Sequence, residues 1–175
     1  MTLNPDIVRA RASEIEESVA RLERFAPLTA DEFISNQDAV DVACYRLMVA
    51  IEAALALCYH VSARRFRKAP EDYASCFAVL QEAGLLPADL TARLQRIARF
   101  RNLLVHMYWK VDYQRVHEII RHDLQDLRAF VAVVVRLAQE PPAGDRPLPH
   151  QQADHRTAGV TSLEAALGTG SRPPR

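Results

Sequence analysis

The feature that most restricts the fold of this chain is the near absence of glycine from its first 140 residues. Gly84 is the single glycine there, whereas the other four glycines and six of the ten prolines lie after residue 140. The first part is rich in alanine, leucine, arginine and glutamate, which favour helices. After residue 140 few large apolar side chains are available to offset the entropy of ordering the backbone. We therefore predict an all-α domain over residues 1–140 and a mostly disordered tail over 141–175, with partner binding by the tail as the alternative.

Apolar residues in the first part recur at steps of three and four, which predicts about five helices joined by short loops in an up-and-down bundle. The expected helices cover residues 5–25, 38–65, 70–84, 88–110 and one continuous helix from Asp112 to about 140. Pro70 suits the first turn of the third helix, Gly84 suits its end, and Asp112 is a good N-cap for the last helix.

Composition restricts the class of protein. Lys plus Arg and Asp plus Glu both number 22, so the formal net charge is zero, which argues against a globally basic nucleic-acid coat protein. The longest uninterrupted apolar stretches are about seven residues, whereas a membrane-spanning helix needs about 20. The N-terminus lacks the apolar segment of a secretory signal. Cys44, Cys58 and Cys76 form no C-x-x-C pair, which indicates reduced core cysteines without a metal. We expect a soluble, cytoplasmic protein that contacts no membrane.

The segment from Leu90 to Lys110 concentrates positive charge. It contains five cations and no acid, a local charge of +5 in a neutral protein. Arg93, Arg96, Arg99 and Lys110 are therefore weak candidates for RNA phosphate contacts. For the three arginines, a solvated arginine face is an equally good explanation.

Arg101 differs from these arginines because it lies in the inward stripe of the same helix, between Ile97 and Leu104. A buried guanidinium is unfavourable unless an anion meets it. Arg101 therefore either pairs with an internal acid or faces a cleft or a second subunit. On a regular helix Arg101, Asn102, His106 and Tyr108 spread over an arc of about 160°. They can line one groove, but they cannot all touch one small atom unless the helix ends nearby or a second copy contributes.

The identities of the residues in this segment are more informative about function than their spacing. RNLLVHMYWKVD, residues 101–112, resembles the HEPN superfamily signature in the extended form Arg-Asn-x-x-x-His-x-Tyr that marks HepT-type toxins. The resemblance covers about residues 33–140. It includes a long alanine-rich helix and a Pro-x-x-Tyr helix that starts near Pro70 and ends in Glu-Ala-Gly at residues 82–84.

This resemblance implies an activity and its partners. HepT-like proteins are homodimers whose two motifs meet in one cleft and act as a metal-independent endoribonuclease without a cofactor. His106 would be the general acid and base, Arg101 would hold the scissile phosphate, and Asn102 would orient the site. A nucleotidyltransferase antitoxin of the MNT type would transfer AMP units from ATP onto Tyr108. The alternative is a HEPN domain that binds its nucleotidyltransferase partner, or a nucleotide, and cleaves nothing.

The remaining histidines are weaker candidates. His117 and His122 lack the i, i+4 spacing of a helical zinc site, and we expect both to be exposed to solvent. His60 precedes a cluster of cations at the end of a helix, where positive charge complements the helix dipole.

Overall fold

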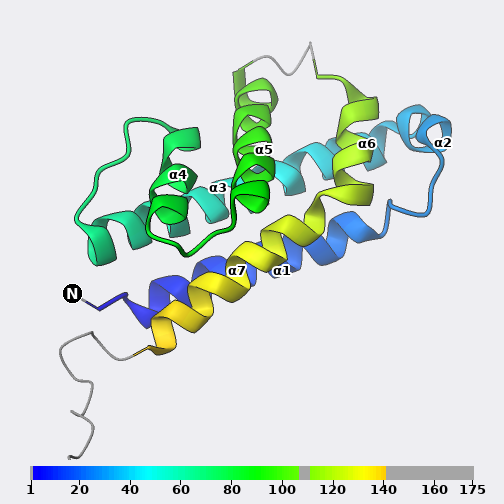
Figure 1. Ribbon diagram of the computed structural model, residues 1–175. Helices are drawn as coiled ribbons and strands as arrows, with labels where there is room; N and C mark the ends of the chain where they lie inside the picture. The colour runs from blue at the N-terminus through cyan, green and yellow to red at the C-terminus, as the bar shows by residue number, and fades with distance from the viewer. Residues whose placement is uncertain (1, 107–110, 141–175) are drawn as a thin grey trace, which may run out of the picture.

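The computed structural model describes residues 2–106 and 111–140, and for residue 106 the backbone alone. Within these residues every regular element is an α-helix (Figure 1). The helices in chain order are α1 (Pro5–Glu23), α2 (Ala30–Ser35), α3 (Gln37–Phe66), α4 (Tyr73–Glu82), α5 (Ala88–His106), α6 (Tyr113–His122) and α7 (Leu124–Gln139). The prediction of an all-α bundle is confirmed. The predicted disordered tail, 141–175, and the predicted extension of α5 to residue 110 lie outside the described residues.

Helix α3 is the centre of the bundle. It has 30 residues and contacts every other helix. In Figure 1 α1 and α7 lie together along one side of α3, whereas α4, α5 and α6 stand against its other side. By length and composition α3 resembles a membrane span, with a mean hydropathy of 1.6, but half of its apolar window is buried in the bundle. The sequence contains no long uninterrupted apolar run here, because Arg46 and Glu52 interrupt the apolar residues of α3. The similarity of α3 to a membrane span was therefore not predicted.

Two differences raise the number of described helices from about five to seven. The sequence pattern missed α2, because six residues are too few for a helical period. A capping box starts this helix: the Thr29 hydroxyl accepts from the Glu32 amide at 3.3 Å, and the Glu32 carboxylate accepts from the Thr29 amide at 2.8 Å.

The second difference is that the predicted last helix is two helices. Asp123 ends α6, where its amide donates to the Ile119 carbonyl at 2.9 Å, and it also begins α7. The apolar stripe continues across this junction, so periodicity alone suggested one helix. The predicted N-cap at Asp112 is confirmed, since its carboxylate accepts from the Gln114 amide at 2.9 Å.

The ends of α4 agree with the sequence pattern to within a turn. The helix begins at Tyr73, later than predicted from Pro70, because Asp72 is the N-cap and accepts from the Ser75 amide at 2.7 Å. Gly84 follows the helix with φ of +73°, the left-handed conformation that favours glycine at a helix end.

The prediction for His117 is wrong. The side chain is 3% exposed and stacks on the Phe33 ring with centroids 5.2 Å apart, because α2 lies against α6. His122 is exposed, as predicted.

The helix-dipole prediction is wrong for His60, because its Nε2 accepts from the Asn4 amide at 3.0 Å and so carries no proton. Burial and the nearby Arg64 lower the pKa of His60, in agreement with a neutral ring. Cys58 and Cys76 are buried, as predicted for core cysteines, whereas Cys44 is half-buried.

Candidate active site on helix α5

Helix α5 presents its arginines on different sides, and their surroundings differ. Arg93 is used within the fold: its Nη1 lies 3.0 Å from the Asp89 carboxylate and its Nε lies 2.9 Å from the Asp126 carboxylate on α7. Arg96 and Arg99 are exposed, and neither has an acid within 4.0 Å among the residues that the structure describes. The charge of Arg93 is therefore largely neutralised, whereas Arg96 and Arg99 keep theirs.

Arg101 leans into the bundle, and its side chain is only 14% exposed. Its Nε donates to a carboxylate oxygen of Glu52, which lies on α3. Its guanidinium carbon lies 5.0 Å from the centre of the Tyr73 ring at the start of α4, within the range of a cation–π contact. Of the two possibilities that the sequence left open, pairing with an internal acid is present. Because the Glu52 side chain is 42% exposed, the pair lies at the edge of the bundle and not deep inside it.

The contacts of Arg101 leave part of its guanidinium available. Glu52 occupies the Nε side, and Nη1 has a long contact of 3.5 Å with the Asn102 side-chain oxygen. Within residues 2–106 and 111–140, Nη2 has no acceptor. The Nη1–Nη2 edge is therefore suited to two parallel hydrogen bonds with a phosphate.

Beyond its long contact with the Arg101 Nη1, Asn102 also borders a cavity of the surface. It is exposed and lines a cavity of about 240 Å³ together with Tyr73 and Arg99. Asp72 also lines this cavity; hydrogen bonding from Ser75 lowers the pKa of its carboxyl, and Arg99 lowers it further. The cavity therefore holds one carboxylate and one guanidinium beside the motif asparagine.

Residue 106 is the last described residue of α5. Its backbone lies on the helix face of Asn102, four residues earlier, and about 140° around the helix from Arg101. The predicted modification site, Tyr108, and the weak RNA candidate Lys110 lie outside the described residues.

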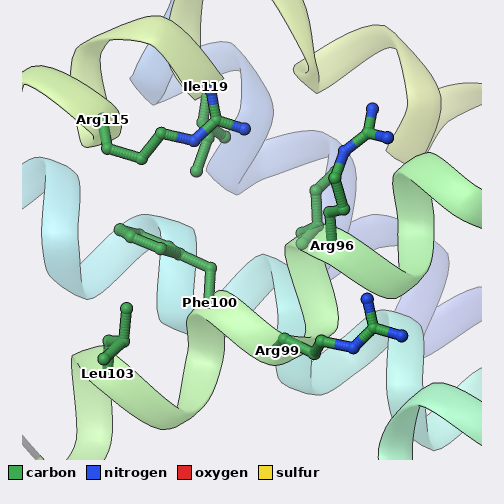
Figure 2. Close-up of a pocket in the computed structure, with 7 residues that line it drawn as sticks. Arg96, Arg99, Phe100, Leu103, Arg115 and Ile119 are labelled. Atoms are coloured by element: carbon green, nitrogen blue, oxygen red, sulfur yellow. The ribbon is translucent and has the colours of Figure 1, made fainter.

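A second cavity of about 300 Å³ lies between α5 and α6 (Figure 2). Its lining residues are apolar or carry guanidinium groups: Arg96, Ile97, Arg99, Phe100, Leu103, Arg115 and Ile119. Arg99 lines this cavity and the one beside Asn102, so the two cavities meet at one side chain.

Sequence reasoning missed three residues of this region: Glu52, Tyr73 as a partner of Arg101, and Arg115. Glu52 left a signal, since it is the one acid in α3 after Asp41 and stands among apolar residues. Arg115 gave no such signal, because an arginine three residues before Glu118 is an ordinary pair on a helix surface.

Comparison with known proteins places the chain in a family. Residues 15–134 match the model of the family described as ribonuclease HepT-like. The chain belongs to the ribonuclease HepT-like family. The resemblance carried by the Arg-Asn-x-x-x-His-x-Tyr motif is thereby confirmed, and the match begins earlier, within α1.

Three relatives whose roles are described are distant from this chain in sequence. The mRNA nuclease HepT of Shewanella oneidensis is 21% identical over 129 residues, which are 74% of this chain and 96% of that protein. The tri-AMPylated HEPN toxin of Shewanella oneidensis, solved in complex with an MNT antitoxin, has a TM-score of 0.67 at 21% identity, over 74% of this chain and 96% of that one. A toxin–antitoxin structure with AMP-PNP also has a TM-score of 0.67, at 20% identity, over 74% of this chain and 98% of that one. At these identities the solved structures establish the shared fold.

Proposed function

We propose that this protein is the toxin of a toxin–antitoxin pair, a metal-independent endoribonuclease that a nucleotidyltransferase antitoxin neutralises by AMPylation. The observation that carries the proposal is the state of Arg101. This chain belongs to the ribonuclease HepT-like family, and Arg101 is the arginine of its motif. Glu52 binds the Arg101 Nε, and the edge formed by Nη1 and Nη2 stays available to bind a phosphate.

The chemistry assigned to the motif is transfer of a phosphodiester to the neighbouring 2′-oxygen. His106 takes the proton of the 2′-hydroxyl, whose oxygen attacks the adjacent phosphorus, and the 5′-oxygen leaves with a proton. The products are a 2′,3′-cyclic phosphate and a 5′-hydroxyl. An imidazole suits this role because it gains and loses a proton near neutral pH. Arg101 stabilises the negative charge that develops on the phosphate oxygens, and Asn102 orients the substrate.

The active form is a homodimer. Arg101 points toward α3 and α4, and the backbone of residue 106 lies about 140° around α5, so a single copy spreads the motif over two faces. A second copy related by a two-fold axis supplies the missing side of the cleft. The substrate is RNA, and we place the protein in the cytoplasm without a membrane contact.

Regulation uses Tyr108, two residues beyond His106. Addition of AMP there places a bulky anion at the mouth of the cleft, where it blocks RNA and occupies the positive field of the arginines. The HEPN toxin of Shewanella oneidensis with the same fold is tri-AMPylated and bound to an MNT antitoxin, which supports this part of the proposal.

Cleavage of total RNA by the purified protein, with and without EDTA, tests the activity. The wild type should cleave RNA equally under both conditions, and His106→Ala should not cleave while it keeps the helical circular-dichroism spectrum. A folded wild type that cleaves nothing would contradict the proposal and favour a binding module. Cleavage that EDTA abolishes would contradict the metal-independent mechanism.

Intact-mass spectrometry tests the regulation. After incubation with a nucleotidyltransferase encoded beside the toxin and with ATP, the wild type should gain AMP units, whereas Tyr108→Phe should gain none and should escape neutralisation. AMP addition that persists in Tyr108→Phe would place the modified residue elsewhere.

A further inference from the structure

The cavity between α5 and α6 is separate from the contacts of Arg101, and its lining combines two kinds of surface. We propose that it binds a nucleotide of the RNA substrate next to the scissile phosphate, with the base against Phe100, Leu103 and Ile119 and the phosphate at Arg96 and Arg99. This inference rests on the proposed ribonuclease function and extends the substrate contacts of that site.

The apolar part of the cavity is suited to a base. Its volume of about 300 Å³ lies at the lower end of the range of small-ligand sites. Ile119 and Phe100 are 1% and 7% exposed, so packing holds them in place. Figure 2 shows the Phe100 ring extending from α5 toward α6, where Arg115 and Ile119 lie. The parts of these side chains that line the cavity offer an apolar contact to a base of any identity, so this surface provides affinity without sequence preference.

The charged part of the cavity is suited to a phosphate. In Figure 2 the Arg96 and Arg99 guanidinium groups project away from the Phe100 ring, so base and phosphate contacts fall on different sides. Neither guanidinium has an acid within 4.0 Å in the described part of the chain, whereas Arg115 lies 2.7 Å from the Glu118 carboxylate and 3.5 Å from that of Asp123. Asp72 acts on Arg99 only at longer range, so Arg96 and Arg99 are the guanidinium groups of this cavity without a close acidic partner.

The position of the cavity connects it to the motif. Arg99 lines both this cavity and the one that contains Asn102 and Tyr73, and Tyr73 lies under the Arg101 guanidinium. Arg99 and Asn102 are three residues apart and are therefore neighbours on the helix surface. A strand of RNA with one phosphate at Arg101 thus continues along α5, past Arg99, into the cavity.

Binding of a labelled RNA tests the inference in a background that does not cleave. The probe is a fluorescein-labelled single-stranded RNA of mixed sequence, with an abasic strand of the same length as a second probe, and the protein carries His106→Ala. The test variant adds Arg96→Ala and Arg99→Ala. The matched control adds Arg24→Ala and Arg136→Ala, which remove two other exposed arginines that have no acid within 4.0 Å in the described ranges.

We expect the test variant to raise the Kd for RNA about tenfold or more and the control to raise it less than about twofold, measured by fluorescence anisotropy. The His106→Ala protein should prefer the RNA over the abasic strand, and Phe100→Leu, which keeps an apolar side chain, should reduce that preference. Arg96→Lys with Arg99→Lys should restore most of the affinity, because point charges attract phosphates as well.

Three results would overturn the inference: equal weakening by the test variant and the control, equal affinity for RNA and abasic RNA, or loss of antitoxin binding with RNA binding unchanged. The last result would assign the cavity to the protein partner. These failures are distinct from failure of the proposed function. If the wild type cleaves total RNA while the test variant binds as tightly as the control, the cavity is not a subsite and the ribonuclease activity stands.

Discussion

Arg101 and Arg128 both lean toward the bundle, yet their surroundings differ. Arg128 on α7 is 29% exposed and meets two carboxylates of α1: its Nε lies 3.0 Å from Glu16, its Nη2 lies 3.0 Å from Glu23, and its Nη1 also contacts Glu23. Arg101 is 14% exposed and meets one carboxylate, that of Glu52.

The more buried arginine therefore has fewer acidic partners, which is the reverse of what stability alone favours. Charge removed from water is unfavourable unless it is fully paired. Arg128 uses all three guanidinium nitrogens to join α7 to α1, and this accounts for its place in the fold. Arg101 uses Nε for the fold and keeps the Nη edge, and this is the arrangement expected of an arginine that binds an anion.

We expect the largest effect on RNA cleavage from replacing Arg101 by lysine, and no effect from the same change at Arg128. Arg101→Lys should lower RNA cleavage by about 100-fold or more, because an ammonium cannot make the two parallel contacts of a guanidinium. Arg128→Lys is the control and should cleave like the wild type. A gel assay on total RNA measures both variants. Full activity of Arg101→Lys would show that a point charge is sufficient at this position.

Removal of the Glu52 charge is a gentler change to the same contact. Glu52→Gln keeps an oxygen that can accept from the Arg101 Nε but loses the ionic attraction, so the guanidinium is held less firmly. We expect kcat to fall about tenfold with KM within about twofold, since positioning matters most in the transition state. A change in KM alone, with kcat unchanged, would mean that Glu52 affects RNA binding and not orientation.

Removal of the Arg128 side chain should affect stability and not cleavage. Arg128→Ala is expected to lower the free energy of unfolding by about 1–2 kcal/mol, from the loss of partly exposed ion pairs and of packing by the side-chain stem. Urea denaturation followed by circular dichroism measures this change. Arg121→Ala, which removes an exposed arginine of α6, is the control and should stay close to the wild type. Loss of cleavage in a folded Arg128→Ala protein would contradict the division of roles.

The smallest expected effect is the pH dependence of this stabilisation. Hydrogen bonds from Arg128 hold the pKa of the Glu23 carboxyl below its usual range. A lowered pKa in the folded state means that the contribution is present at neutral pH and is lost as pH falls through the folded pKa. The difference in unfolding free energy between wild type and Arg128→Ala should therefore shrink below about pH 4. If the difference in unfolding free energy stays constant between pH 7 and pH 3, the stabilisation by Arg128 comes from packing and not from the ion pair.

Much of the architecture follows from local patterns. The steps of three and four predicted most of the helices, Asp112 predicted the start of α6 and Gly84 predicted the end of α4, because these signals act within a few residues. The position of Arg101 in an apolar stripe predicted that it would need an anion. Helix α2 was missed because it is too short to show a helical period. The break at Asp123 was missed because the apolar stripe continues across it.

The sequence by itself determined the all-α class, the spacing of Arg101, Asn102, His106 and Tyr108, and the family that this motif marks. Only the tertiary structure decided that Glu52, 49 residues away, meets Arg101, that Phe33 covers His117, and that Arg115 closes a cavity beside Phe100. The reason is physical. A helical period records which residues of one helix face inward, but the residue opposite each of them depends on how all the helices pack together around α3.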